Sequence, residues 1–266
     1  MKYIASLPAL ILCVLSTFSA DIQAANGQQE TVSAAATLLL THPESAFVAP
    51  PAGVANFVVS IDHQPLPYDA PQILFQKFAS DADFIAGVWK DAQGNVAHQR
   101  EVLIVKPDYG VVVDHLYGWK SCHEVSCVVA LPAGELKAEG GVHRFNLGSG
   151  KDFIVQYLGS SAPSADPTIT SSAGFSSLSE TYRLSLPAPF ASVFYSGRSA
   201  APKIEYIKPS NPMVVKCKVT LPDGRIDEVG IAWEWRDQLH LGGKVMKGWA
   251  AVARKGPGAA GDIEIK

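Results

Sequence analysis

Two runs of β-branched and aliphatic residues flank a short turn near the middle of the chain. The runs are Val102 to Val105 and Val111 to Val113, and Lys-Pro-Asp-Tyr-Gly at 106 to 110 separates them. Pro107 and Gly110 supply the turn chemistry of a five-residue hairpin loop. Because neither run alternates with polar residues, we predict that both strands are buried on both faces, inside a sheet packed against another layer.

Further strand-like runs continue along the chain. Ala-Gln-Gly-Asn at 92 to 95, Pro-Asp-Gly at 222 to 224 and Gly242-Gly243 are typical of the turns between strands. Residues 160 to 179 are dominated by small side chains and predict a mobile loop or lid. No stretch keeps the periodicity of a helix. We therefore predict an all-β fold, an antiparallel β-sandwich of two layered sheets, over residues 71 to 254.

Alternation of apolar and polar positions is cleanest in two late runs. Mostly polar residues separate the apolar side chains of the first run, which are Met213, Val215, Cys217, Val219 and Leu221. The second run repeats the pattern with Val229, Ile231, Trp233 and Trp235. The two runs predict one half-exposed layer, with both tryptophans in the core.

The two ends of the chain differ from this strand-rich region. Residues 1 to 24 contain Lys2, an apolar stretch and Ala24, the pattern of a secretory signal peptide cleaved after Ala24. We therefore expect a periplasmic or secreted protein, with no membrane segment after cleavage because no later stretch is long enough to span a bilayer. Residues 25 to 70 predict an N-terminal arm or edge strands, and residues 255 to 266 predict a frayed tail.

The formal net charge of -3 at pH 7 limits the classes of partner. A chain with this balance has no electrostatic case for binding nucleic acid. It also has no overall attraction for an acidic polysaccharide, which would have to be held by a local basic patch.

Three cysteines follow the signal peptide: Cys122, Cys127 and Cys217. In an exported protein, one disulfide and one free thiol is the simplest arrangement. Cys122 with Cys127 would close a short loop, Cys127 with Cys217 would join two strands, and three buried free thiols are the remaining alternative. The cysteines lack zinc spacing and the seven histidines are scattered, so we expect no metal and no cofactor.

The central hairpin belongs to a longer ordered set of residues. The run from Arg100 through Lys-Pro-Asp-Tyr-Gly to Asp114 is followed by a glycine, by His123 and by Leu131-Pro132. This order resembles the C-terminal β-sheet region of heparinase II/III-type polysaccharide lyases, most strongly over residues 84 to 158.

The resemblance implies an acidic, uronate-containing polysaccharide as the partner and β-elimination as the reaction class. In that family most catalytic groups come from a helical toroid and from a His-x-His-x-Asp segment that precede the β-region. Neither occurs here, and Ala130 stands where a second histidine of the family is expected. We therefore do not expect a complete lyase, and a separate helical-toroid chain is a candidate partner.

Several residues of this region are candidates for holding a uronate. His98 and Arg100 lie two apart, so their side chains leave the same strand face and could receive a carboxylate; a solvated strand end is the alternative. Asp114 and His123 match family positions. The alternative for Asp114 is a turn or a pair with Arg100, and that for His123 is a hydrogen-bonded structural histidine.

Aromatic side chains form a second candidate surface. His115, Tyr117 and Trp119 share one strand face and could stack against sugar rings, although they could instead cover the edge of the core. Tyr109 is expected as an exposed aromatic at the hairpin tip. We accordingly expect an exported module that binds or helps to process acidic polysaccharide; the alternative is a non-catalytic binding or accessory sandwich that recruits a partner.

Overall fold

The structure is a computed structural model that describes residues 57–65, 72–90, 94–106, 108–117, 122–132, 135–139, 142–146, 152–158, 164, 166–172, 175–197 and 202–266. The described residues contain strands and turns and no helix, and every strand pairing among them is antiparallel. The expected signal peptide and most of the expected N-terminal arm lie outside these ranges. The all-β, antiparallel, layered fold is as predicted.

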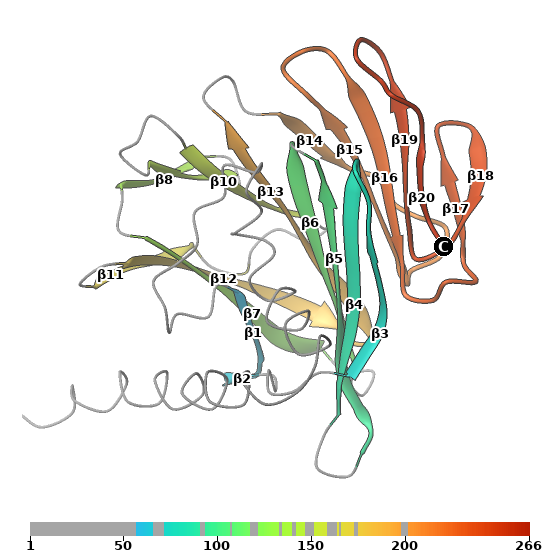
Figure 1. The fold of residues 1–266 in the computed structure, drawn as a ribbon. Helices are drawn as coiled ribbons and strands as arrows, with labels where there is room; N and C mark the ends of the chain where they lie inside the picture. The colour runs from blue at the N-terminus through green and yellow to red at the C-terminus, as the bar shows by residue number, and fades with distance from the viewer. Residues whose placement is uncertain are drawn as a thin grey trace, which may run out of the picture.

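An eight-stranded sheet forms the middle layer (Figure 1). Its strands, in spatial order, are β3 (Gln72–Phe78), β4 (Ala82–Lys90), β5 (Val96–Val105), β6 (Tyr109–Leu116), β13 (Ala188–Gly197), β10 (Asp152–Leu158), β9 (Val142–Asn146) and β8 (Glu135–Glu139). The predicted central hairpin is β5 and β6. Both strands are interior strands of the sheet, because β4 pairs with β5 and β13 pairs with β6.

Two five-stranded sheets cover the two faces of this middle layer (Figure 1). The first sheet contains β11 (Thr168–Ser172), β12 (Phe175–Ser185), β7 (Cys122–Pro132), β1 (Phe57–Ile61) and β2 (Gln64–Pro65). The second sheet contains β14 (Lys203–Tyr206), β15 (Val214–Thr220), β16 (Ile226–Ala232), β19 (Ala250–Lys255) and β20 (Ile263–Ile265). A hairpin of β17 (Gln238–Leu241) and β18 (Lys244–Lys247) packs on the outer face of the second sheet. The structure thus adds a third main sheet to the two that were predicted.

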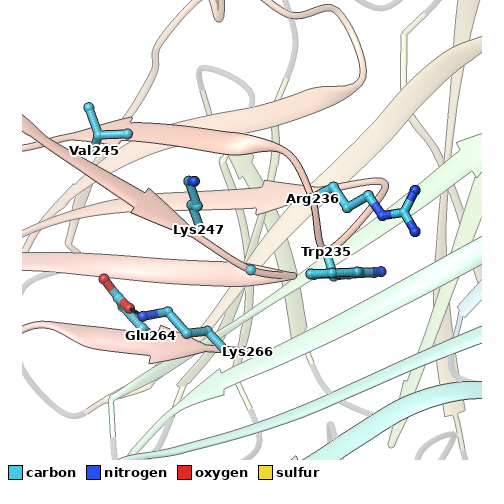
Figure 2. A pocket seen from close by; sticks show the side chains of 7 residues that line it. Trp235, Arg236, Val245, Lys247, Glu264 and Lys266 are labelled. Carbon is cyan, nitrogen blue, oxygen red and sulfur yellow. Dashed lines mark ion pairs between the residues drawn. The ribbon is translucent and has the colours of Figure 1, made fainter.

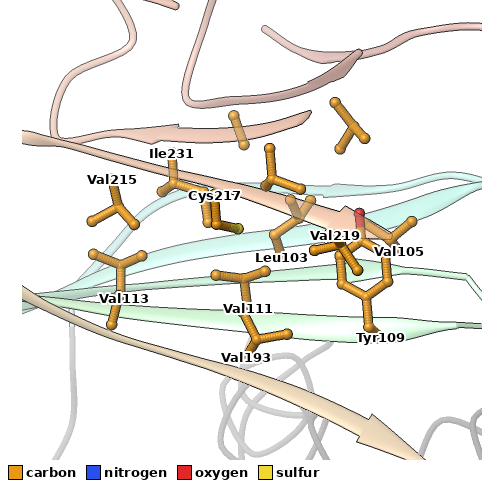
Figure 3. Close-up of a cluster of buried hydrophobic side chains, with 14 of the residues drawn as sticks. Leu103, Val105, Tyr109, Val111, Val113, Val193, Val215, Cys217, Val219 and Ile231 are labelled. Carbon is orange, nitrogen blue, oxygen red and sulfur yellow. The ribbon is translucent and has the colours of Figure 1, made fainter. Parts of the chain in front are cut away.

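The valine-rich strand β6 is buried along its whole length because each of its faces meets a different sheet. Val111 and Val113 point into a core shared with β15 and β16 of the second sheet (Figure 3). Val112 and Leu116 point into the core shared with β7 and β12 of the first sheet. A strand between two apolar layers has no wet face, which explains why its sequence does not alternate.

The loop of the central hairpin is shorter than predicted. Val105 pairs directly with Tyr109, and the Asp108 amide donates a 2.8 Å hydrogen bond to the Val105 carbonyl. Only residues 106 to 108 therefore form the loop, and Tyr109 is a strand residue.

Two predicted flexible segments form strands instead. Residues 168 to 172 and 175 to 179, inside the predicted mobile loop, pair with each other as β11 and the start of β12. The predicted frayed tail contains β20, which pairs with β19 and buries Ile263 and Ile265 in the core. In both cases a short run with β-branched residues pairs with a neighbouring strand, which satisfies its backbone hydrogen bonds.

Candidate functional site

A buried ion pair lies on the face of the middle sheet that meets β7 and β12. Arg100 on β5 and Asp114 on β6 are cross-strand partners. Arg100 Nε lies 2.8 Å from Asp114 Oδ1, and Arg100 Nη2 lies 3.0 Å from Asp114 Oδ2, so the guanidinium and the carboxylate make a bidentate pair. The Asp114 carboxylate is fully buried. The alternative given for Asp114, a pair with Arg100, is the arrangement found.

His98 leaves β5 on the same face as Arg100, as the spacing predicts, but it is fully buried. Its ring stacks on Trp89 with the ring centroids 4.4 Å apart and an interplanar angle of 5°. Its Nε2 lies 3.7 Å from Asp114 Oδ1. Burial lowers the pKa of His98 to about 4, with Asp114 acting to raise it and Arg100 to lower it further. His98 is therefore neutral at pH 7, and its burial contradicts both the carboxylate receptor and the solvated strand end that were predicted here.

A second polar cluster lies on the opposite face of the same two strands. His115 Nε2 is 3.0 Å from Glu101 Oε2, and Gln99 Nε2 donates a 2.9 Å hydrogen bond to the Trp233 carbonyl. The His115 ring stacks on Trp233 at 5.7 Å, and the Tyr117 ring meets Trp233 edge-on at 4.8 Å. Burial raises the pKa of Glu101. His115 and Tyr117 thus cover the edge of the core, the alternative to sugar stacking, while Trp119 lies outside the described residues.

His123 lies on β7, in the first covering sheet rather than in the middle sheet. Its Nδ1 is 2.7 Å from Asp62 Oδ2, and the Glu124 amide donates a 3.0 Å hydrogen bond to Asp62 Oδ1. The hydrogen bond from His123 lowers the pKa of Asp62. This contact joins β7 to the turn between β1 and β2, in keeping with a hydrogen-bonded structural histidine.

Tyr109 is fully buried, so the prediction of an exposed aromatic at the hairpin tip is wrong. Its hydroxyl donates a 2.9 Å hydrogen bond to Asp227 Oδ2 on β16. Arg225 Nε lies 3.2 Å and Arg254 Nε lies 3.9 Å from the same carboxylate. Burial raises the pKa of Tyr109, so the hydroxyl stays protonated as a donor between two sheets.

Sequence reasoning missed a third buried polar cluster, between the middle sheet and the first covering sheet. His143 Nε2 on β9 contacts Glu180 Oε1 on β12, and the Tyr182 hydroxyl donates a 2.5 Å hydrogen bond to Glu180 Oε2. All three side chains are buried. The spacing of Glu180 and Tyr182 places them on one strand face, but the sequence has no signal that pairs them with a histidine on another sheet.

The three cysteines that follow the expected signal peptide are free thiols. Cys122 is exposed, while Cys127 and Cys217 are buried. Cys127 belongs to the core between the middle sheet and the first covering sheet, and Cys217 belongs to the core on the other side of the middle sheet. The predicted arrangement of one disulfide is therefore wrong: the middle sheet separates Cys127 from Cys217, and Cys122 and Cys127 lie five residues apart on the single strand β7.

The structure instead reveals an exposed aromatic and basic surface at the hairpin that covers the second sheet (Figure 2). Trp235 follows the end of β16 in a turn, and 55% of its surface is exposed, so the prediction that it lies in the core is wrong. Trp233 is partly buried. The alternation breaks because β16 ends at Ala232 and the chain then turns toward β17. A Trp-Arg pair in the short turn between two strands is the sequence signal that could have indicated this surface.

Within the described ranges, no group of three or more His, Cys, Asp or Glu side chains lies close enough together to hold a metal ion. Those ranges also contain no helix long and apolar enough to cross a membrane.

Solved structures of heparinase III and of heparan sulfate lyase have a similar fold. A heparinase III gene product is 15% identical to this chain, with a TM-score of 0.50 over 65% of this chain and 29% of that protein. Heparan sulfate lyase HepC from Pedobacter heparinus is 14% identical, with a TM-score of 0.50 over 67% of this chain and 30% of the lyase. The matched part is the C-terminal β-region, which confirms the resemblance expected from the central hairpin.

This chain spans less than a third of the length of those lyases. Comparison with protein-family models gives no match. Comparison with curated protein sequences gives no match either.

Proposed function

We propose that this chain is an exported β-module, related to polysaccharide lyases, that binds acidic polysaccharide and lacks a complete β-elimination site of its own. The observation that carries this proposal is the fold, since the neighbours with the same layered β-region are heparin-type and heparan sulfate lyases. The matched region makes up 29% to 30% of those chains, so the rest of their length has no counterpart in the match.

The burial of the candidate acid and base groups argues against a catalytic site among them. β-Elimination needs a cation on the uronate carboxylate, a base for the carbon-bound proton and an acid for the leaving oxygen. Here the Arg100 guanidinium is already paired with Asp114, and His98, Glu101 and His115 are fully buried. A polymer cannot reach these groups without opening the interface between two sheets. We assign these buried groups a structural role, in which their contacts stabilise the packing of the middle sheet against the two covering sheets.

The proposal is tested by incubating the purified protein with heparan sulfate, heparin and alginate. Binding is measured by calorimetry, and formation of unsaturated uronate is followed by ultraviolet absorbance. We expect binding to at least one acidic polymer, no unsaturated product, and no binding to neutral dextran. Sustained turnover would show that the chain holds a complete lyase site, and absence of binding to every acidic polymer would contradict the binding function.

The separate helical-toroid partner gains no support from the comparisons, because the matched region is part of one longer chain in each neighbour. An accessory role can still be distinguished experimentally. A module that only recruits another protein would bind none of the purified acidic polymers, which is the result that contradicts the binding function.

A further inference from the structure

An open hollow of about 570 Å³ lies at the covering hairpin, where several chain segments meet (Figure 2). Trp235 and Arg236 come from the turn between β16 and β17, and Val245 and Lys247 come from β18. The remaining lining residues are Gly248, Glu264 and Lys266. The volume falls in the range of about 300 to 1,000 Å³ that is usual for small-ligand sites.

The aromatic component of the hollow is Trp235. More than half of its surface is exposed, at 55%, and the Arg236 guanidinium carbon lies 5.1 Å from the centre of its ring. This distance is within the range of a cation-π contact, which holds the guanidinium over one face of the ring. The other face of this exposed indole can contact the apolar face of a sugar ring while the guanidinium pairs with an anionic substituent of the sugar.

The charge of the hollow is opposite to that of the chain as a whole. Arg236, Lys247 and Lys266 supply three cationic side chains, and Glu264 supplies an anionic side chain. Glu264 contacts Lys266, which leaves Arg236 and Lys247 as the cations without a carboxylate partner inside the hollow. The formal net charge of the whole chain is -3, so this is the kind of local basic patch that an acidic polymer would need.

The backbone beneath the hollow is held in place. Gly248 has a φ of +137°, and a Cβ atom at this position would lie 2.1 Å from the Ile265 carbonyl oxygen. The next residue, Trp249, donates a 2.8 Å hydrogen bond from its amide to that same oxygen. On the other side of β18, Met246 is buried against the second sheet. Lys247 therefore projects from a strand that is fixed at both its inner face and its end.

We propose that this hollow is the subsite that holds an anionic sugar unit of the acidic polysaccharide. The assignment deepens the proposed function and rests on it. The Trp235 ring packs against the C–H face of the sugar, Arg236 pairs with a carboxylate or sulfate on that unit, and Lys247 neutralises a second anionic group. Lys266, already in contact with Glu264, adds long-range attraction.

Two variants test the subsite. Trp235→Ala removes the stacking surface, and Arg236→Gln with Lys247→Gln removes two charges while keeping side-chain length. Matched controls are Ile169→Ala, which truncates another large exposed apolar side chain, and Lys137→Gln with Lys203→Gln, which removes two exposed charges at other strands. Each variant is first checked for an unchanged unfolding midpoint, and Trp235→Phe replaces Trp235→Ala if the alanine variant does not fold.

Affinity for a heparin-derived oligosaccharide is measured by calorimetry at low and at physiological salt. We expect each test variant to bind at least about tenfold more weakly than the wild type, and each control within about threefold. The double-charge variant should also show a weaker dependence on salt, because fewer ionic contacts remain to be screened.

The other outcomes separate the two proposals. If the wild type binds acidic glycan and the test variants bind equally well, the subsite is wrong while the proposed function stands. If the wild type binds no acidic glycan, the proposed function fails and the subsite with it. Equal binding of a single-stranded DNA oligonucleotide of matched charge, lost in the same variants, would make the hollow a general polyanion site and would overturn the assignment to sugar.

Discussion

The Tyr109 hydroxyl donates a 2.9 Å hydrogen bond to the Asp227 carboxylate, and this contact joins the middle sheet to the second covering sheet. Asp227 is fully buried between Arg225 and Arg254. Burial raises the pKa of Asp227, and Arg225, Tyr109 and Arg254 act in the opposite direction. Tyr109, the first residue of β6, thus donates one of the hydrogen bonds that the buried Asp227 carboxylate accepts between the two sheets.

Tyr109→Phe removes the hydroxyl and leaves Asp227 with one fewer donor. We expect the free energy of unfolding to fall by about 1 to 3 kcal/mol, the cost of leaving a buried polar group unsatisfied. Urea denaturation measures the change, and Tyr206→Phe, at a partly exposed tyrosine, is the control. Equal stability of the Tyr109 variant and the wild type would show that the two arginines satisfy Asp227 without the hydroxyl.

Arg100→Met leaves the Asp114 carboxylate buried without its cation. We expect this change to lower the free energy of unfolding by about 3 to 5 kcal/mol, because an unpaired buried charge is strongly unfavourable. Replacing both partners, Arg100→Met with Asp114→Leu, should recover most of the loss, since no charge then remains to be desolvated. Guanidinium denaturation of the three proteins measures both effects. A double variant as unstable as the single one would contradict the pairing argument.

His98 should make the protein less stable in mild acid. Its pKa is about 4 in the folded state against 6.5 in the unfolded chain, so the unfolded state takes up a proton first as the pH falls. The stabilisation is complete above about pH 6.5, is lost as the pH falls toward about 4, and amounts to roughly 3 kcal/mol.

Unfolding free energies across this pH range should therefore fall more steeply for the wild type than for His98→Gln, which cannot titrate. His240→Gln, at an exposed histidine on β17, should keep the wild-type slope. Parallel curves for the wild type and the His98 variant would show that His98 does not have the lowered pKa.

Gly248→Ala should destabilise the protein more than Gly243→Ala. Both glycines have a positive φ, +137° and +81°, so both substitutions strain the backbone. At Gly243 the added Cβ meets nothing within 4 Å, whereas at Gly248 it would lie 2.1 Å from a backbone oxygen of Ile265. Thermal unfolding of both variants isolates the clash as the difference between them. A Gly248 variant no less stable than the Gly243 variant would show that β20 can move away.

Thiol labelling of the folded protein should modify Cys122 and spare Cys127 and Cys217. Cys122 is exposed, and burial raises the pKa of the Cys217 thiol to about 12 and that of Cys127 well above its usual value. The reactive thiolate is therefore scarce at both buried positions. Peptide mapping after maleimide treatment, with and without denaturant, measures the difference. Labelling of Cys127 in the native protein would indicate that the first covering sheet opens.

The wrong predictions for Tyr109 and Trp235 have one physical origin, the position at which a strand begins or ends. Placing Tyr109 in a five-residue loop exposes its side chain, but pairing that extends to Val105 and Tyr109 turns it into the core. Extending the alternation of β16 through Trp235 buries that ring, but the strand ends at Ala232 and leaves it in solvent. A shift of two or three residues in where pairing stops decides whether an aromatic is a core residue or a surface for a ligand.

Residue order alone was enough to show that both faces of the central hairpin are buried and that His98 and Arg100 leave the same side of β5, because strand geometry is a local property with a period of two. What those faces contact depends on how the three sheets pack together. Asp227, the partner of Tyr109, lies 118 positions farther along the chain. Whether a side chain finds water, a carboxylate or another sheet depends on such distant contacts, and no local period contains them.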